Sequence, residues 1–217
     1  MVTMCAEATS KRPPLDSTVV SRLRFRFATH QDIPAVVDLV QSAYRGEESR
    51  AGWTTEADLI DGQRIDATML ARTIDQAETY ILLAEAHDEP SGHELVGCAE
   101  ISRYSGDGGG AYFGLFAVRP SLQGQGIGGR ILDEIERLSV ELLREARLVL
   151  VVISLRSDMV ELYARRGFVP TGDVHLFPYG DERFGRPKRD DLELLVMAKE
   201  LTRARPFENP DRESTIR

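Results

Sequence analysis

Residues 118–130 read VRPSLQGQGIGGR, and they join an apolar run, AYFGLFAV (111–118), to an amphipathic segment that begins near residue 126. Glycine occupies four of the six positions from 124 to 129. Fixing a glycine costs more conformational entropy than fixing any other residue, so a turn with only a structural role has little use for four of them. The first N–H groups of a helix lack intrahelical partners, and they bind phosphate when small residues let the backbone approach the anion. The stretch therefore predicts a phosphate site between a strand and a helix.

Two familiar nucleotide motifs fit this turn poorly. Gly124, Gly126 and Gly129 satisfy the G-x-G-x-x-G pattern of dinucleotide-binding folds. That motif directly follows the first strand of a βαβ unit and needs an acidic residue at the end of the next strand, about 20 residues further on, and the sequence meets neither condition. The P-loop needs Lys-Ser/Thr after its last glycine, whereas Arg130 and Ile131 stand here. A pyrophosphate bound by the helix N-terminus is the favoured interpretation.

The hydrophobic pattern predicts a mixed α/β domain whose sheet is mostly antiparallel and flanked by helices. The predicted strands are 25–29, 79–86, 94–101, 111–118, 148–154 and 191–201. The first predicted helix begins with a cap at 30–32. Further helices are predicted at 67–76, 126–146 and 159–168, and another helix start is predicted at 54–56. We expect one domain, 23–202, between a flexible N-terminal tail (1–22) and a C-terminal tail (203–217).

Composition and charge argue against several classes of protein. The formal net charge of −8 argues against a nucleic-acid-binding surface, which is normally basic. The longest apolar runs, such as LVLVVI (148–153), are far shorter than the ~20 residues of a membrane span. The N-terminus lacks the apolar core of a signal peptide, and a disulfide between Cys5 and Cys98 is not expected. We therefore expect a cytoplasmic protein that binds neither membrane nor nucleic acid.

Three stretches together resemble one family. QGQGIG (123–128) resembles the Q/R-x-x-G-x-G/A coenzyme A motif of the GNAT N-acetyltransferases, and LFAVRP (115–120) resembles their splayed central strand. LYARRGF (162–168) is similar to their L-Y-x-x-x-G-F helix end. The resemblance covers roughly residues 24–201 and implies the acyl-CoA N-acyltransferase fold. It also implies direct transfer of an acetyl group from acetyl-CoA to a primary amine of a small molecule or peptide, with no metal.

The resemblance also implies a coenzyme site. Backbone atoms of Phe116 and Val118 would contact the pantetheine arm. Arg156 stands where many relatives have an asparagine, seven residues before the tyrosine of the helix motif, so it is a candidate coenzyme contact in place of that asparagine. The backbone N–H groups that would hold the pyrophosphate belong to Gln123, Gly124, Gln125, Gly126, Ile127, Gly128 and Gly129.

The catalytic candidates follow from what amine acetylation needs. Tyr163 matches the family's general acid, which protonates the leaving thiolate, although the same residue also suits a packed helix position. An alkyl amine is mostly protonated at neutral pH, so a general base should help. Glu100, on an otherwise apolar strand, is one candidate base and Tyr112 is another, but a solvated glutamate is the alternative for Glu100. Cys98 as a covalent acetyl carrier is disfavoured, because family members usually transfer the group directly.

The acceptor site is expected in the segment between the first two helices. Trp53 and Glu56 lie there among further carboxylates, and an aromatic wall with acidic groups suits an ammonium ion. Helix capping is the alternative role for Glu56. The aromatic stretch 175–191 is expected to cover the acceptor side or to form a homodimer contact.

Two other functions compete with this reading. One is a coenzyme A-binding regulator without turnover, which the retained Tyr163 disfavours. The other is a nucleotide-dependent oxidoreductase, which the missing ribose-binding acid disfavours.

Overall fold

The computed structural model describes residues 23–88 and 92–202, so the two predicted tails and Cys5 lie outside the described residues. Within them one seven-stranded sheet has the order β1-β3-β4-β5-β6-β9-β7. Only β5 and β6 run parallel, and every other neighbouring pair is antiparallel. These strands are β1 (Arg24–Phe27), β3 (Thr79–Asp88), β4 (Gly92–Tyr104), β5 (Gly110–Val118), β6 (Arg147–Ile153), β7 (Val169–Leu176) and β9 (Glu193–Glu200).

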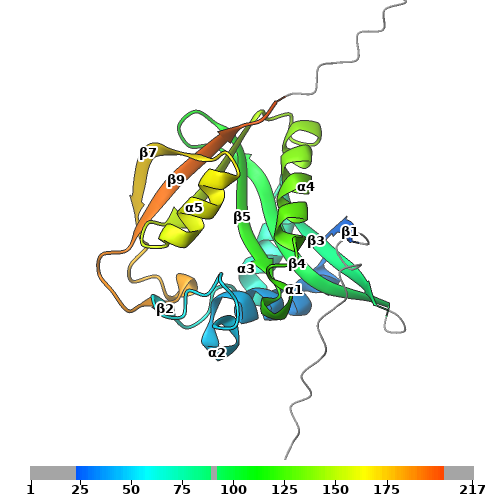
Figure 1. Ribbon diagram of the computed structural model, residues 1–217, viewed down its shortest axis with the longest axis horizontal. Coiled ribbons are helices and arrows are strands. Elements are labelled where there is room, and N and C mark those ends of the chain that lie inside the picture. Colours follow the sequence, from blue (N-terminus) through cyan, green and yellow to red (C-terminus); the bar gives the residue numbers. More distant parts are fainter. Residues whose placement is uncertain (1–22, 89–91, 203–217) are drawn as a thin grey trace, which may run out of the picture.

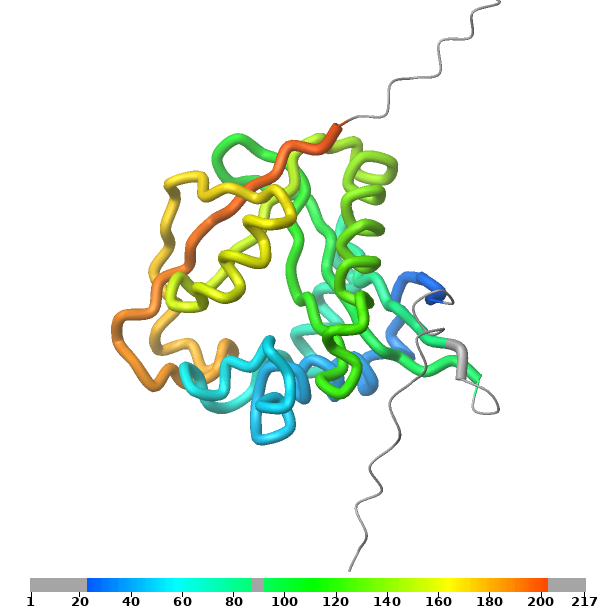
Figure 2. The backbone as a smooth tube through the Cα atoms, viewed as in Figure 1, coloured from blue at the N-terminus to red at the C-terminus, as the bar shows by residue number. Residues whose placement is uncertain are grey.

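Helices cover both faces of this sheet (Figures 1 and 2). On one face, α4 (Ile127–Glu141) and α5 (Ser157–Arg165) pack over β5 and β6 through a core that contains Phe113, Ile131 and Leu150. On the other face, α1 (Ile33–Tyr44) and α3 (Ala67–Asp75) pack over β3, β4 and β5. Among the described residues, no helix is long and apolar enough to cross a membrane.

Short elements complete the described fold around one end of the sheet. A two-stranded ribbon pairs β2 (Ile60–Asp61) with β8 (Arg186–Pro187), which brings the stretch after β7 against the segment that follows α1. The other short elements are α2 (Gly46–Ser49), η2 (His30–Asp32), η3 (Pro120–Leu122) and η4 (Glu182–Phe184).

The predicted strands and most of the predicted helices are confirmed, with three corrections. The helix expected to reach residue 146 ends at Glu141, because Arg144 adopts a left-handed conformation (φ +63°) that turns the chain out of the helix. No helix begins at residues 54–56, because the Thr54 and Thr55 hydroxyls bond outside a helix, to the Ala43 carbonyl oxygen and to the Ser49 hydroxyl. The aromatic stretch 175–191 is not only loop, since it holds the end of β7, η4 and β8.

A bulge at the centre of the sheet separates β5 from β6. Cys98 pairs with Ala117 and Glu100 pairs with Gly114, so β5 has one residue more than β4 over this interval. Leu115 in the extra stretch has a left-handed conformation (φ +43°), which is uncommon for a residue with a side chain. A bulge bends its strand and strengthens the local twist. The parallel pairing with β6 accordingly spans only residues 111–113 of β5, and beyond Phe113 the two strands form an open fork.

Asp32 fastens β1 to the start of α1, and its loss is expected to destabilise the fold. The carboxylate accepts two bonds from the Arg26 guanidinium at 2.7 and 2.9 Å and one from the Thr29 N–H at 2.8 Å. The Arg26 guanidinium holds the pKa of Asp32 far below its usual range. A lowered pKa contributes stability that is present above the unfolded-state pKa and is lost as the pH falls through the folded-state pKa.

We therefore expect Asp32→Asn to lower the free energy of unfolding by about 1.5–3 kcal/mol at neutral pH, with the difference shrinking only under strongly acidic conditions. Urea unfolding at several pH values measures this. Asp75→Asn is the matched control, because among the described residues Asp75 pairs only with His30, and its side chain is 66% exposed. Equal unfolding free energies for Asp32→Asn and wild type at neutral pH would contradict the assignment.

Candidate active site

The glycine-rich turn presents a row of unpaired N–H groups at the start of α4. Gly124 (φ +79°) and Gly126 (φ +86°) are left-handed, as glycine readily allows. Gly128 lies under the Phe116 ring, and an added Cβ would sit 3.0 Å from the ring's Cζ atom. Arg130 donates its N–H to the Gly126 carbonyl oxygen at 3.2 Å, whereas within the described residues the N–H groups of 124–129 donate to no backbone carbonyl. Such a row suits an anion.

Gln123 holds this turn against the segment 53–55. Its Nε2 donates to the Thr54 hydroxyl oxygen and to the Val118 carbonyl oxygen, both at 2.9 Å. Its Oε1 accepts the Trp53 N–H at 2.8 Å, and its own N–H donates to the Pro120 carbonyl oxygen at 3.3 Å. All three Gln123 donors are therefore engaged within the protein.

Arg156, at the N-cap of α5, also binds the segment 53–55. Its guanidinium donates to the carbonyl oxygens of Trp53 (2.6 Å), Thr54 (3.3 Å) and Thr55 (2.7 Å), and twice to the Asp158 carboxylate. A guanidinium has five N–H donors, and these five bonds use them all. Arg156 therefore has no donor left over for a phosphate in this conformation, and it links the segment 53–55 to α5.

The fork between β5 and β6 exposes one edge of β5. The backbone N–H and C=O groups of successive strand residues point alternately to the two neighbouring strands. Arg119 donates its N–H to the Val96 carbonyl oxygen, on the β4 side. Phe116 and Val118 therefore direct their backbone groups into the fork. Their carbonyl oxygens accept bonds from the Tyr44 hydroxyl and from Gln123, and β6 pairs with β5 no further than Phe113, so on this side their N–H groups face the open fork.

Tyr163 lies at the apex of the fork. Its ring packs edge-on against Phe113, the last paired residue of β5, with ring centroids 6.2 Å apart, and against Phe168 at 5.8 Å. Burial raises the pKa of Tyr163 well above 10.0, and the Arg156 charge lowers it only in part. Among the described residues the Tyr163 hydroxyl has no hydrogen-bond partner. The hydroxyl is therefore protonated at neutral pH and free to donate.

A cavity of about 470 Å³ opens on the opposite face of the sheet at the same level. Successive strand residues point to opposite faces, so Phe113 faces Tyr163 while Tyr112 lines the cavity. The end of β7 with the stretch that follows it and the ribbon at β2 lie on its far side. Its lining residues are Arg45, Glu56, Ile60, Arg64, Tyr112, Val151, Ile153, His175, Leu176, Phe177, Pro178, Phe184 and Leu194. The glycine turn and a partly open site of small-molecule size therefore lie on opposite sides of the fork.

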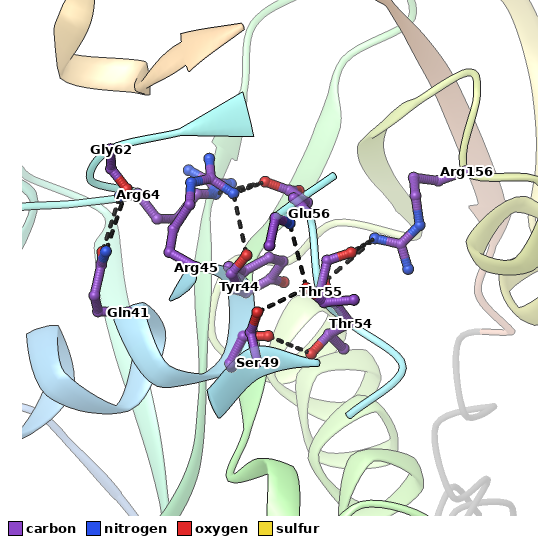
Figure 3. Close-up of polar contacts among 12 residues, drawn as sticks. Gln41, Tyr44, Arg45, Ser49, Thr54, Thr55, Glu56, Gly62, Arg64 and Arg156 are labelled. Carbon is purple, nitrogen blue, oxygen red and sulfur yellow. Dashed lines mark hydrogen bonds and ion pairs between the residues drawn. The ribbon is translucent and has the colours of Figure 1, made fainter. Parts of the chain in front are cut away.

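Three charged side chains gather in this cavity (Figure 3). Arg45, almost wholly buried, forms an ion pair with Glu56 through Nη1. Arg64 places its Nε 3.9 Å from the same carboxylate oxygen, and its guanidinium carbon lies 5.4 Å from the centroid of the Tyr44 ring. Glu56 itself is held in place because its N–H donates to the Tyr44 carbonyl oxygen at 2.9 Å.

Glu100 and Tyr112 lie next to this cluster. Burial raises the pKa of Glu100, while the Ser102 hydroxyl, donating at 3.1 Å, and the charge of Arg64 lower it in part. Burial also raises the pKa of Tyr112, and the Glu100 charge raises it further. A carboxyl with a raised pKa accepts a proton more readily than an exposed one, which is the property that a general base needs.

Cys98 faces the core, not the cavity. It is fully buried, and its thiol donates to the Leu115 carbonyl oxygen at 3.6 Å. Burial raises the pKa of this thiol to about 12. Since the thiolate is the nucleophile, such a cysteine is inert at neutral pH.

The sequence model of the acetyltransferase (GNAT) family matches residues 33–168, which is more than half of the chain. The chain belongs to the GNAT acetyltransferase family. It is therefore an acyltransferase. No curated protein matches the sequence.

Several solved structures share the GNAT fold. The spermidine N-acetyltransferase of Vibrio cholerae, solved with CoA and spermine, is 16% identical with a TM-score of 0.58, and the match covers 84% of this chain and 98% of that one. A putative phosphinothricin N-acetyltransferase is 19% identical with a TM-score of 0.57, covering 83% and 99%. An N-acetyltransferase of Staphylococcus aureus Mu50 is 10% identical with a TM-score of 0.57, covering 82% and 97%. At these identities the likeness concerns the fold alone.

In this GNAT chain the residues singled out from the sequence occupy two sides of the fork. Tyr163 and the turn 123–129 lie on the side of α4 and α5, whereas Glu56 and Tyr112 line the cavity. Trp53 is not among the cavity-lining residues, and its backbone is held by Gln123 and Arg156 with the residue 37% exposed.

Three residues of this GNAT site, Tyr44, Arg45 and Arg64, are not marked as functional by the sequence pattern. Tyr44 falls in an apolar helical pattern that predicts only a packed side chain, yet its hydroxyl donates to the Phe116 carbonyl oxygen inside the fork. Arg45 follows the end of an amphipathic helix, which alone predicts a solvated cation. No local pattern marks Arg64.

Proposed function

We propose that this GNAT protein transfers the acetyl group of acetyl-CoA to a primary amine of a small molecule or peptide, by direct attack in a ternary complex. One observation carries the proposal. β5 parts from β6 after Phe113, with a row of free N–H groups on one side of this fork and a cavity lined by Tyr112 on the other. A donor with a phosphate end and a reactive end, and an acceptor in the cavity, would then meet at Tyr163.

The residues fit the coenzyme in this arrangement. The N–H groups of 124–129 and the positive end of α4 would hold the pyrophosphate. The N–H groups of Phe116 and Val118 face the fork, where β6 does not pair with β5, so they would bind the pantetheine arm or polarise the thioester carbonyl. Gln123 and Arg156 would act indirectly, since their donors hold the segment 53–55 beside the turn.

The reaction needs one proton removed and one supplied. The amine nitrogen forms a bond to the thioester carbonyl carbon, the carbon–sulfur bond breaks, the nitrogen loses a proton and the thiolate gains one. Glu100 would accept the proton of the amine, directly or through water, and Tyr112 beside it is the second candidate. Tyr163, which stays protonated, would give its proton to the thiolate.

The test is a thiol-release assay with acetyl-CoA and a panel of amines that includes spermidine, phosphinothricin, amino acids and lysine peptides. We expect thiol release that depends on at least one amine and yields one acetylated amine per thiol, as read by mass spectrometry. Binding of acetyl-CoA without release for every amine would overturn the proposal in favour of a coenzyme-binding protein without turnover.

A further inference from the structure

The cavity holds more positive than negative charge. Two guanidinium groups, Arg45 and Arg64, line it with a single carboxylate, Glu56, and both cations lie within 4 Å of the same oxygen of that carboxylate. Glu100 lies nearby but forms no ion pair with either arginine among the described residues. Because one carboxylate offsets one guanidinium, the lining residues leave one positive charge without a partner.

Arg45 is the side chain that most needs a further partner. Its side chain is 2% exposed, and its Nε atom is buried with no hydrogen-bond partner. Its Nη1 contacts Glu56 and the Tyr44 carbonyl oxygen. Its Nη2 makes no hydrogen bond among the described residues, and Arg45 lines the cavity. Buried charges are normally paired, and an unsatisfied donor on one is costly.

Arg64 brings a second set of free donors to the same place. Its guanidinium rests over the Tyr44 ring and makes no hydrogen bond among the described residues. A planar guanidinium with free N–H groups matches a carboxylate or phosphonate in a bidentate arrangement. A polyamine, by contrast, would bring further positive charge to two arginines.

We infer that the acceptor is a small amine that also carries an anionic group, such as an amino acid or an aminophosphonate, and that Arg45 and Arg64 bind the anion. This rests on the proposed acetyl transfer and names its substrate class. The anion site adjoins one candidate base, because Tyr112 and Arg64 line the same cavity. The anionic group and the reactive nitrogen are therefore only a few bonds apart, which the cavity of about 470 Å³ accommodates.

Matched acceptor pairs test the inference. We would compare L-methionine and β-alanine with their amides, and 2-aminoethylphosphonate with ethanolamine, in the thiol-release assay, with spermidine as the polycation. An amino acid amide has a less basic amine and so more free amine at neutral pH, which favours the amide chemically. We expect kcat/KM for the anionic member to exceed that of its neutral partner by roughly tenfold or more. Equal or better turnover of the amides or of spermidine would overturn the inference.

Arg64→Gln tests the site itself, because Arg64 is half-buried and its loss leaves the Arg45–Glu56 pair intact. We expect KM for the anionic acceptors to rise about tenfold or more, KM for acetyl-CoA to stay within about twofold, and the preference over amides to shrink. Arg50→Gln is the matched control, because Arg50 pairs with Glu47 and Asp58 outside the cavity. An unchanged preference in Arg64→Gln would contradict the role of the arginines.

Binding measurements separate this inference from the proposed reaction. Calorimetry with the full chain would measure the affinity of the same acids and amides, with and without coenzyme A. If acetyl-CoA gives no thiol release with any amine but the acids still bind more tightly than the amides, the proposed reaction fails while the anion site stands. If the acids neither bind nor react, the anion site is wrong whether or not another amine is acetylated.

Discussion

Tyr163→Phe is expected to lower kcat for thiol release by roughly 100-fold, which is typical for the loss of a general acid. The hydroxyl stands at the apex of the fork with no partner among the described residues, and burial keeps it protonated. KM for acetyl-CoA should change little, since the proposed phosphate and pantetheine contacts come from backbone groups elsewhere. Steady-state kinetics on the purified full chain measures both constants.

The fold should survive this substitution, which makes the result interpretable. The ring of phenylalanine retains the edge-on contacts that Tyr163 makes with Phe113 and Phe168. Tyr80→Phe is the matched control, because Tyr80 packs against Phe27 near the opposite edge of the sheet. Turnover of Tyr163→Phe equal to that of the control would remove Tyr163 from the mechanism.

Glu100→Gln is expected to reduce kcat by about 100-fold and to remove the acidic limb of the pH profile. A general base works only when it is unprotonated, so activity should rise as the pH rises through the pKa of Glu100. Burial raises that pKa above 4.5, so the limb lies at a higher pH than that of an exposed glutamate. Measuring kcat against pH for wild type and variant reveals the limb and its loss.

Glu94→Gln provides the comparison for Glu100, because Glu94 lies on the same strand and faces Arg119 at 3.4 Å, away from the cavity. A Glu100→Gln enzyme with wild-type kcat and an unchanged acidic limb would leave Tyr112, or a water beside it, as the base. Tyr112→Phe would then be expected to show the larger loss.

The parts of the proposed site that can be read from the sequence are those built from consecutive residues. The turn 123–129 reads directly as an anion site, because free N–H groups at a helix start and left-handed glycines are local properties. Gly167, with φ +89°, ends α5 as its position after the helical pattern predicts. The strands around the fork were also predictable, since alternation and buried apolar runs are local signals.

The bulge was beyond such reasoning. Leu115 has no turn signature in the sequence. Its left-handed conformation arises because β4 and β5 pair on both sides of it, at Cys98–Ala117 and Glu100–Gly114, and β5 has one residue more than β4 between these pairs. The ribbon of β2 and β8 was missed for a similar reason, since each strand has two residues and gains its stability only from the other.

The sequence by itself determined the family resemblance and the candidates for the donor site and the general acid, because each depends on residues a few positions apart. Only the tertiary structure showed which charged side chains line the cavity proposed for the acceptor. Arg45, Glu56 and Arg64 come from irregular segments after α1 and meet around one carboxylate. Arg156 and Gln123 bind the segment 53–55 from elements about 70 to 100 residues away. The charge balance of a cavity depends on which side chains line it and on how far each is removed from water. Neither can be read from residues that are adjacent in the sequence.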